Sequence, residues 1–330
     1  MTTPDHEAGG GPIAEDRLHA RFRASGAELP ASVLIGPGDD MGLVDHAGPL
    51  LVAADQVVLG RHVRPDEQGF AVGRKAVLRN LSDVAAMAAT PVAMVATATL
   101  GPGQDERWAT ELHRGLHETG LRWKTPLVGG DLATHGVPEG PTVVSVTVLA
   151  SPHQATGRVV TRDGGRPGDL LVVTGTLGGS LAEDGGGRHL DFPPRIREAS
   201  ALLDGLDREL RAMIDLSDGL ARDASRLAAA GGLVARLDPT AIPTNPGCDW
   251  RRAIGDGEDY ELLAAIGCPP PERVMEVPLT VVGRLEEPSP TLSPGAVVVG
   301  EGTDAERVDH LGWEHRGDES SKPDGGRRLE

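Results

Sequence analysis

Aromatic residues are nearly absent from this chain of 330 residues, which has only three Phe, four Trp and one Tyr. Its apolar fraction of 39% comes mainly from Ala, Val and Leu, so the core has to be built from small aliphatic side chains. Cores of this kind suit sheets that are covered by Ala-rich helices. Because the chain is long enough for two domains of ordinary size, we expect two cores rather than one.

Cysteine is also scarce. Cys248 and Cys268 do not repeat at metal-ligand spacing and indicate no disulfide framework, which fits a reducing cytoplasm. The first eleven residues contain neither the basic nor the apolar segment of a secretion signal. No apolar run approaches the roughly 20 residues that span a bilayer. We therefore expect a soluble, cytoplasmic protein with no membrane partner.

Positive charge is in the minority, with 32 Lys and Arg against 49 Asp and Glu and a formal net charge of -17. Such a charge repels nucleic acid and anionic membrane surfaces, so we expect neither as a partner. Most of the acidic residues are expected to lie on a solvated surface.

Two common nucleotide-binding signatures are missing from the sequence. Lys75 and Lys124 both lack the glycine pattern that precedes a P-loop lysine, and no Gly-x-x-x-x-Gly-Lys-Ser/Thr segment occurs, which excludes a P-loop. Neither His-Arg-Asp nor Asp-Phe-Gly occurs, which excludes the protein-kinase set. Any nucleotide site in this chain therefore needs another scaffold.

Short apolar runs alternate with longer helical patterns, which is typical of an α/β (α+β) protein. The predicted strands are Leu50–Ala54, Val92–Leu100, Thr142–Ala150, Asp169–Thr174, Ala212–Leu216, Leu233–Leu237, Glu261–Ile266 and Leu279–Gly283. The predicted helices are Asp66–Ala89, Gln104–Thr119, Pro194–Leu203, Asp218–Ala230 and a short one at Pro270–Met275. We predict an N-terminal domain at residues 13–150, a C-terminal domain at residues 151–315, and disordered tails at residues 1–12 and 316–330.

Six short acidic motifs are spread over the chain, most of them where an apolar run ends. Carboxylates that gather from separate segments repel each other unless cations lie among them, so a convergent set predicts magnesium that holds phosphates. The motifs are Gly38-Asp39-Asp40, Asp55, Asn80-Leu81-Ser82-Asp83, Gly129-Gly130-Asp131, Asp215-Leu216-Ser217-Asp218-Gly219-Leu220 and Gly257-Glu258-Asp259-Tyr260-Glu261.

The first three motifs also have ordinary structural explanations. Asp40 follows a Pro-Gly pair that is typical of a surface turn. Asp55 ends an apolar run, a position that faces the ligand crevice in open α/β sheets or is a plain strand end. Asp83 lies among small apolar residues of a predicted helix, so we expect it to be buried and paired. Its partner is either a metal ion or an arginine, Arg74 or Arg79.

The next two motifs lie where a phosphate can approach the backbone. Asp131 follows two glycines, in what we predict to be a strand that opens into a loop. Asp215 and Asp218 bracket Ser217, which we predict to be the N-cap of the following helix. The free N–H groups of that helix suit a phosphate oxygen, and a plain capped helix is the alternative.

The last motif and a Gly- and Arg-rich segment add weaker signals. Glu258 belongs to a run of acids that also contains the single Tyr of the chain, and such a run can simply be solvated. Arg158 and Arg162 are spaced to grip phosphate oxygens, although surface arginines are common.

In order and spacing, these motifs resemble the thiamine-monophosphate kinases, relatives of aminoimidazole ribonucleotide synthetase. The resemblance covers about residues 34–315. Its most specific segments are Asn80-Leu81-Ser82-Asp83-Val84-Ala85-Ala86-Met87, Gly157-Arg158 through Arg162 to Gly168-Asp169, Thr174-Gly175-Thr176-Leu177-Gly178, Pro194-Arg195-Ile196, Asp215–Leu220 and Gly257–Leu262.

The resemblance implies a two-domain PurM-like fold in which each half is α/β and the N-terminal sheets of two subunits form a shared barrel, hence a homodimer. It implies ATP as co-substrate with several magnesium ions. The magnesium ligands it implies are Asp40, Asp55, Asp83, Asp131, Asp215 and Asp218, of which Asp83, Asp131 and Asp218 are also catalytic. The implied ATP contacts are Gly130, Arg162 and Ser217, and the implied contacts to thiamine phosphate are His62, Glu258 and Trp313.

The implied reaction is transfer of the γ-phosphate of ATP to the phosphate of thiamine monophosphate, giving thiamine diphosphate and ADP. The chain departs from the family pattern at Ala53-Ala54, where Ser/Thr-Thr is usual, and at Leu132, where Thr is preferred. Two alternatives stay open: a related ATP-dependent synthetase of the aminoimidazole ribonucleotide type, and a non-catalytic paralogue that senses a nucleotide or thiamine phosphate. Relatives that make selenophosphate or mature hydrogenase rely on a reactive terminal cysteine, which this chain lacks.

Overall fold

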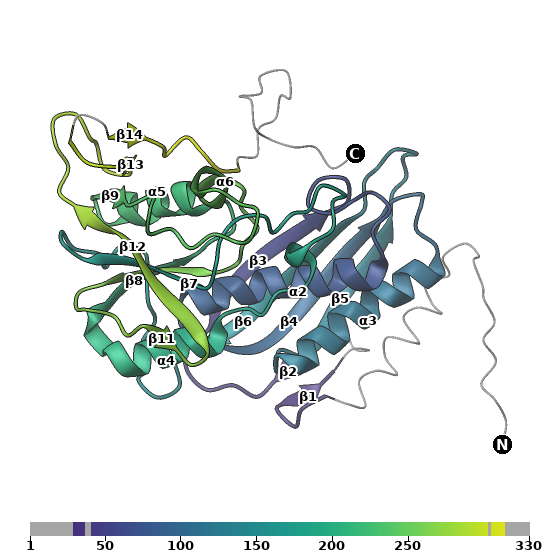
Figure 1. Cartoon of the computed structure of the whole chain (residues 1–330). Coiled ribbons are helices and arrows are strands. Elements are labelled where there is room, and N and C mark those ends of the chain that lie inside the picture. The colour runs from purple at the N-terminus through teal and green to yellow at the C-terminus, as the bar shows by residue number, and fades with distance from the viewer. Residues whose placement is uncertain (1–28, 37–40, 303–304, 314–330) are drawn as a thin grey trace. The chain divides into compact units, whose positions relative to one another are not determined.

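The computed structural model describes residues 29–36, 41–302 and 305–313 (Figure 1). The predicted tails, residues 1–12 and 316–330, lie outside the described residues. By contacts the chain divides into two compact units. The described residues up to Asn80 form the first together with Pro91–Leu149, and Leu81–Thr90 forms the second together with the residues from Ala150 onward. Residues 81–90, which fall within the predicted N-terminal domain, therefore pack with the second unit.

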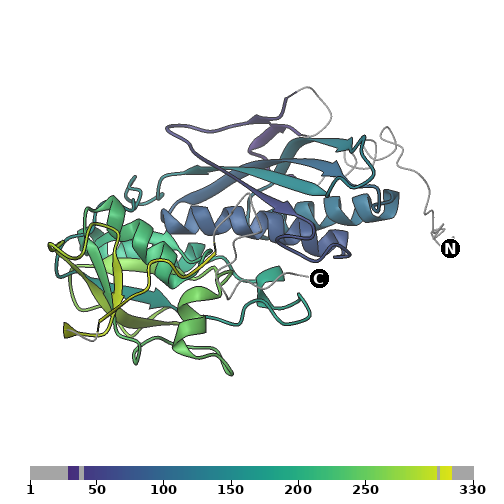
Figure 2. The ribbon, with the colours of Figure 1, turned by 90° about the horizontal axis from the view of Figure 1, so that it is seen from above.

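The first unit is a four-stranded sheet in the order β3-β6-β4-β5, with two helices. Figure 2 shows both helices against the same face of this sheet. A hairpin of two short strands, β1 and β2, precedes it. The elements are β1 (Val33–Ile35), β2 (Leu43–Val44), β3 (Leu51–Val58), α2 (Gly69–Ala86), β4 (Thr90–Leu100), α3 (Glu106–Arg122), β5 (Leu127–Thr134) and β6 (Val143–Ser151).

Glycines let α2 and α3 approach each other closely. A Cβ atom at Gly73 would lie 2.4 Å from the carbonyl oxygen of Leu112, and one at Gly115 would lie 2.2 Å from that of Phe70. Real Cβ atoms do not come so near to a backbone oxygen. Each helix therefore uses a glycine where the backbone of the other passes.

The second unit is built on a mixed sheet of eight strands, most of them antiparallel. Its strand order is β14-β13-β9-β12-β7-β10-β8, and β11 pairs with β12 off this path. The strands are β7 (Leu170–Thr174), β8 (Leu210–Asp215), β9 (Val234–Leu237), β10 (Leu262–Ile266), β11 (Arg273–Val274), β12 (Val277–Glu286), β13 (Val297–Val299) and β14 (Glu306–Arg307). The helices are α4 (Ile196–Leu206), α5 (Leu220–Ala230) and α6 (Trp250–Gly255), with short 3-10 turns at Arg188–Leu190 and Asp207–Glu209.

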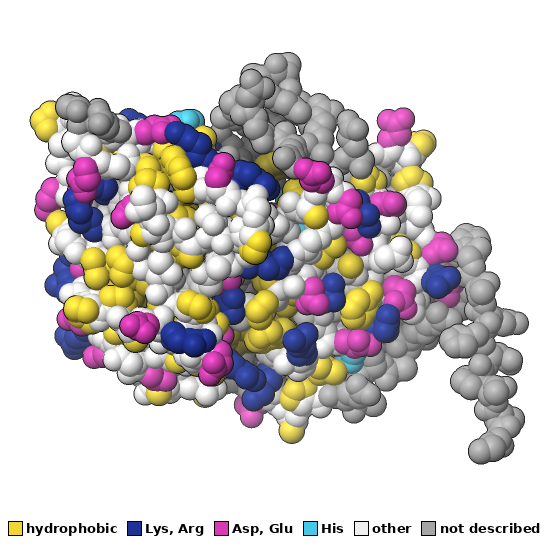
Figure 3. All heavy atoms as spheres, in the orientation of Figure 1, with side chains coloured by type: hydrophobic (Ala, Val, Ile, Leu, Met, Phe, Trp, Pro, Cys, Tyr) yellow, Lys and Arg dark blue, Asp and Glu magenta, His cyan; other side chains and the backbone are white. Residues whose placement is uncertain are grey.

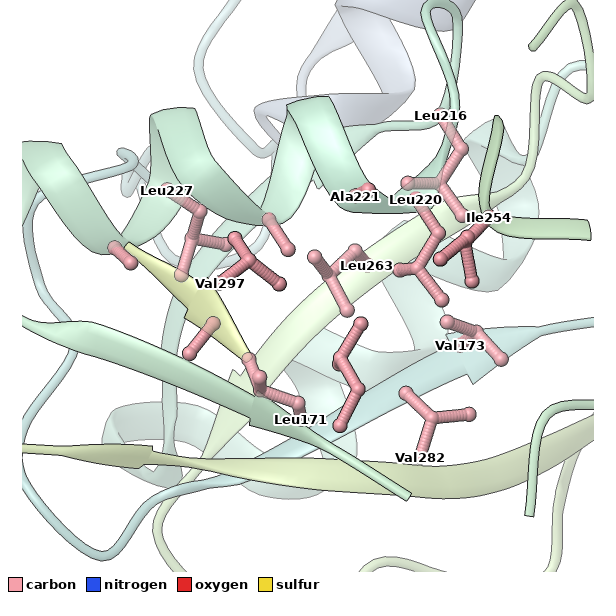
Figure 4. Close-up of a cluster of buried hydrophobic side chains, with 14 of the residues drawn as sticks. Leu171, Val173, Leu216, Leu220, Ala221, Leu227, Ile254, Leu263, Val282 and Val297 are labelled. Atoms are coloured by element: carbon pink, nitrogen blue, oxygen red, sulfur yellow. The ribbon is translucent and has the colours of Figure 1, made fainter. Parts of the chain in front are cut away.

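The central strands of this sheet bury both of their faces. In β10, Leu263 and Ala265 belong to a core with α5 and α6, whereas Leu262, Ala264 and Ile266 belong to a core with α4 and the last turn of α2. Figure 4 shows the first of these cores, with Leu220 and Leu227 of α5 pointing toward the sheet. The cores are made of Ala, Val, Leu and Ile with few larger side chains, as the composition predicts.

The helix predicted at Pro270–Met275 is wrong. Val274 pairs instead with Val277 across a two-residue turn, and Met275 in that turn has φ of 50°. The run of prolines before it cannot supply helical N–H groups, and Pro278 lies one residue beyond the turn, so a hairpin is the available local structure. The extents of β3 and β5 also differ from the prediction, since both strands continue well past the acid at which the apolar run ends.

The surface carries the excess of acidic residues in dispersed form. On the face that Figure 3 presents, Asp and Glu side chains alternate with Lys and Arg rather than forming one block. Among the described residues, no helix has both the length and the apolar character that crossing a bilayer requires.

Candidate active site

Two loops of the second unit lie side by side at the ends of β8 and β10. The amide of Glu258 donates to the carbonyl of Ser217 at 2.7 Å, and the amide of Tyr260 donates to that of Leu216 at 2.8 Å. To make these bonds, Glu258 and Tyr260 adopt φ of 60° and 52°, a left-handed conformation that is uncommon outside glycine. Backbone strain of this kind gathers at functional sites, so this pair of loops is the natural place to look for one.

Asp215 is held at the end of β8 by a residue from a distant part of the sequence. Its side chain is buried, and its Oδ2 accepts a hydrogen bond of 2.8 Å from the hydroxyl of Ser82 on α2. Asp83, the next residue on the helix, is half-buried rather than buried as predicted. The last turn of α2 thus brings the Asn80–Asp83 motif to the Asp215–Leu220 motif.

Asp218 belongs to a small cluster of charges with Asp223 and Arg226 of α5. Arg226 Nη2 lies 2.5 Å from Asp218 Oδ2, and Arg226 Nη1 lies 2.7 Å from Asp223 Oδ1. The other oxygen of Asp223 accepts the backbone N–H of Asp218 at 2.9 Å. Burial, and after it the charges of Asp215 and Asp218, raise the pKa of Asp223 to about 8. Neither Asp223 nor Arg226 was predicted from the sequence. The position of Asp223, an acid in the first turn of the helix after Asp218, could have indicated it.

Ser217 is not the N-cap of this helix. The helix α5 begins at Leu220, its N-cap is Gly219 with φ of 107°, and no side chain caps it. Asp223 reaches back to the amide of Asp218 instead, as the glutamate of a capping box does. Ser217 therefore lies in the loop between β8 and α5, where its hydroxyl is not required for capping.

Trp313 is fixed to the same loop through its backbone. Its amide donates to the carbonyl of Asp218 at 2.9 Å, and its own carbonyl accepts Arg222 Nε at 2.8 Å. Gly312 before it has φ of 103°. The segment that carries the predicted aromatic contact is thus anchored beside the aspartates.

The side chain of Glu258 lies among aromatic and imidazole groups. Its Oε2 accepts the hydroxyl of Tyr260 at 3.2 Å and lies 3.5 Å from Nδ1 of the buried His189. The ring of Tyr260 stacks on Phe192 with centroids 4.0 Å apart. The stack of Tyr260 on Phe192 therefore fixes the position of the hydroxyl that donates to the Glu258 carboxylate.

The two other acids of the Glu258 motif are structural. Asp259 accepts the amide of Gly178, and its pKa is raised to about 6 by burial. Glu261 accepts hydrogen bonds from Nε and Nη2 of Arg195, at 2.7 and 2.6 Å. Both carboxylates are 2% exposed, so the solvated alternative does not apply to them.

The Gly- and Arg-rich segment runs beside β8. The amide of Met213 in β8 donates to the carbonyl of Thr161, and the next residue, Arg162, is exposed. Arg158 pairs with Asp207 at 2.7 Å. Of the two arginines, Arg162 is the one whose guanidinium is not committed to a carboxylate by any described ion pair.

In the first unit, Asp55 lies inside β3 and faces α2. Its Oδ2 is 3.3 Å from Nη2 of Arg79, and its amide donates to Asn80 Oδ1 at 3.1 Å. The prediction of a strand-end position for Asp55 is wrong, since β3 continues to Val58. Arg79, one of the two arginines predicted as alternatives to a metal ion beside Asp83, pairs with Asp55.

Asp131 also lies inside a strand and not at the start of a loop. In β5 it is opposite Thr97 of β4, and both side chains are exposed on the face away from the helices. A Cβ at Gly130 would lie 2.0 Å from the carbonyl oxygen of Ala96, so this glycine is required by strand pairing. Asp55 and Asp131 occupy opposite edges and opposite faces of one sheet, so a single chain does not bring them together.

His62 is buried in the segment after β3. Its Nδ1 accepts the amide of Val58 at 2.9 Å, and its carbonyl accepts the ammonium of Lys75 at 2.7 Å. An Nδ1 that accepts a hydrogen bond carries no proton, so the proton of the neutral ring is on Nε2. Asp40, the remaining predicted residue, lies outside the described residues.

The donor set suits magnesium. In the part of the chain that the structure describes, no group of three or more His, Cys, Asp or Glu side chains is arranged to hold one metal ion. Asp215 and Asp218 nevertheless offer only oxygen atoms as ligands, and magnesium prefers oxygen ligands. The mutual repulsion of Asp218 and Asp223 is relieved by a cation, the guanidinium of Arg226, which lies where they meet. Asp215 and Asp218 offer carboxylate oxygens, the kind of ligand that fits a hard divalent cation.

Comparisons with known proteins show which family the chain resembles. Residues 38–151 match the family model "AIR synthase related protein, N-terminal domain". The thiamine-monophosphate kinase of Rhodopirellula baltica is 32% identical over 296 residues, which cover 82% of this chain and 89% of that protein. A crystal structure of thiamine-monophosphate kinase from Stenotrophomonas maltophilia K279a superposes with a TM-score of 0.70 at 27% identity, covering 87% of this chain and 96% of that one. A structure of AaThiL complexed with AMPPCP and TMP gives a TM-score of 0.64 at 25% identity, covering 81% and 87%.

Proposed function

Since the chain belongs to the thiamine-monophosphate kinase family, we propose that it transfers the γ-phosphate of ATP to thiamine monophosphate, giving thiamine diphosphate and ADP. The observation that carries this proposal is that residues suited to a cation with phosphates and residues suited to thiamine lie on hydrogen-bonded segments of the second unit. Asp215 and Asp218 suit a cation that holds phosphates, and Glu258 and Trp313 are bonded to the same loop. A carboxylate and an aromatic ring suit a cationic heterocycle.

The chemistry needs no strong general base. A phosphate monoester has a second pKa of about 6, so its attacking oxygen is already ionised near neutral pH. That oxygen forms a bond to the γ-phosphorus while the bond to the bridging oxygen breaks, and ADP leaves with the electron pair. What the protein supplies is alignment of two polyanions and neutralisation of their charge.

Magnesium is the group that supplies most of the positive charge when it is bound. We infer that its ligands come from Asp40, Asp55, Asp83, Asp131, Asp215 and Asp218. Ser82 orients Asp215, and Asp223 fixes the amide of Asp218, so these two ligands are held by the chain's own hydrogen bonds.

The remaining predicted residues take roles that their contacts support. Arg162, exposed beside β8, is assigned to the nucleotide phosphates together with Ser217 and the backbone of Gly130. His62 presents a proton at Nε2, which suits an oxygen of the acceptor phosphate. Glu258 and Trp313 are assigned to the thiamine moiety.

We also infer a homodimer in the cytoplasm. The face of the first sheet that carries no described helix exposes apolar residues, with Val52 65% and Val95 37% exposed. A second copy packed on this face would cover them and would pair the exposed edges of β3 and β5. The two free cysteines, Cys248 and Cys268, suit a reducing compartment.

The proposal is tested by incubating the purified chain with ATP, magnesium and thiamine monophosphate and separating the products chromatographically. We expect thiamine diphosphate in amounts equal to the ADP formed. Asp83→Asn should abolish turnover and leave the thermal unfolding temperature close to that of the wild type. Binding of both ligands without any product would support the sensor alternative and overturn the proposal.

A further inference from the structure

Arg226 makes two ion pairs that differ in how deeply they are buried. The side chain of Asp223 is 1% exposed, that of Asp218 is 23% exposed, and that of Arg226 is 43% exposed. Separating Arg226 from Asp223 would leave a deeply buried carboxyl group without its partner, which is costly. The pair with Asp218 faces solvent, where ion pairs are weak and exchange readily.

The planar guanidinium allows the two pairs to be broken separately. Nη1 contacts Asp223 and Nη2 contacts Asp218, so a small rotation releases one acid while the other stays bound. Asp218 keeps its position in either case, because Asp223 holds its backbone amide at 2.9 Å. In this cluster the main chain of Asp218 is fixed, whereas the guanidinium of Arg226 beside its carboxylate can give way to another cation.

We propose that Arg226 competes with the divalent cation for Asp218 and so lowers the affinity of the protein for free magnesium. This inference rests on the proposed function, which makes Asp218 a magnesium ligand. In the metal-free protein Arg226 neutralises Asp218, and it turns to Asp223 alone when the cation arrives. Free magnesium must displace an existing ion pair, whereas magnesium that arrives with a nucleotide brings phosphate oxygens as further ligands. Arg226 therefore favours loading of the cation together with the nucleotide.

The proposal is tested by titrating magnesium chloride into the full-length, nucleotide-free protein in a calorimeter. We expect Arg226→Gln to bind magnesium at least five-fold more tightly than the wild type, because the competing charge is gone. The matched control is Arg251→Gln, which removes an exposed arginine of the same unit that pairs with Glu306 at 2.6 Å. The control should bind magnesium as the wild type does.

A second pair of variants separates competition from a general change of charge. In an Asp218→Asn background, Arg226→Gln should no longer tighten magnesium binding, because the contested oxygen is gone. If Arg226→Gln alone does not fold, Asp223→Asn with Arg226→Gln removes the buried charge along with its partner, and the same tightening is expected. Unchanged or weaker magnesium binding in the variants that fold overturns the inference, as does a gain that persists without Asp218.

The outcome is independent of the kinase assay. Product formation by the wild type together with unchanged magnesium binding in the variant rejects only the role of Arg226. Tighter binding in the variant supports that role whether or not thiamine monophosphate proves to be the acceptor.

Discussion

Ser82 and Asp215 are 133 residues apart in the sequence, yet the Ser82 hydroxyl donates a buried hydrogen bond of 2.8 Å to Asp215 Oδ2. The bond fixes one oxygen of an expected magnesium ligand. It also ties the last turn of α2 to the end of β8. The orientation of Asp215 therefore depends on a residue whose own motif lies in the first half of the chain.

Replacing Ser82 by Ala should lower both stability and magnesium use. The free energy of unfolding should fall by about 1–2 kcal/mol, because a buried acceptor loses its donor. The magnesium concentration for half-maximal activity should rise. The matched control is Ser225→Ala, which removes a 2.6 Å hydrogen bond to the carbonyl of Gly295 away from the aspartates. Equal magnesium dependence in the two variants would mean that the Ser82 bond is only structural.

Replacing Tyr260 by Phe should weaken substrate binding selectively. The stacking on Phe192 is kept, and only the hydroxyl that donates to Glu258 is lost. A hydrogen bond to a charged group is worth roughly 1.5 kcal/mol or more, so KM for thiamine monophosphate should rise about ten-fold while kcat changes little. Steady-state kinetics with each substrate varied in turn measures this. A rise in KM for ATP instead would place Glu258 at the nucleotide.

Replacing Gly130 by Ala should destabilise the first unit before it affects nucleotide binding. The added Cβ would lie 2.0 Å from the carbonyl oxygen of Ala96, so β4 and β5 would have to separate. We expect the free energy of unfolding, measured by thermal denaturation, to fall by about 1–3 kcal/mol. Gly136→Ala is the control, since nothing lies within 4 Å of a Cβ there. A stable Gly130→Ala variant that has lost ATP binding would show that the glycine serves the nucleotide and not the sheet.

The elements were more predictable than the placement of the acids within them. The helices α2, α3, α4 and α5 and the strands β7, β8, β9, β10 and β12 follow from apolar periodicity, whereas the short strand β13, which is buried in the same core, was not predicted. Asp55 and Asp131 were expected at strand ends because the apolar runs stop there. Their strands continue, because backbone pairing with a neighbouring strand does not depend on apolar side chains.

The site was predictable where its residues carry a motif, and not where it depends on pairing in space. Asp215, Asp218, Glu258 and Trp313 were identified from the resemblance, and backbone hydrogen bonds join their loops. Arg226 could not be identified, because an arginine eight residues after an aspartate has no distinctive pattern. Ser217 was misread as an N-cap because Asp223, five residues from the amide it accepts, performs that task.

Asp259 should make stability depend on pH in the acidic range. Its pKa is about 6 in the folded protein against 3.8 for an aspartate in water, because burial disfavours the charge. The stabilisation by its protonated form is therefore complete below pH 3.8 and is lost as the pH rises through about 6. Asp259→Asn stays neutral, so the unfolding temperature of the variant relative to the wild type should increase between about pH 4 and pH 7. A difference that is constant with pH would contradict the raised pKa.

The most direct test of the account follows the transferred phosphate itself. ATP labelled with ³²P at the γ-position is incubated with the protein, magnesium and unlabelled thiamine monophosphate, and the products are separated. The account predicts that the label appears in the terminal phosphate of thiamine diphosphate and that omission of magnesium abolishes the transfer. Label found only in inorganic phosphate or retained in ATP, with thiamine monophosphate unchanged, would contradict it.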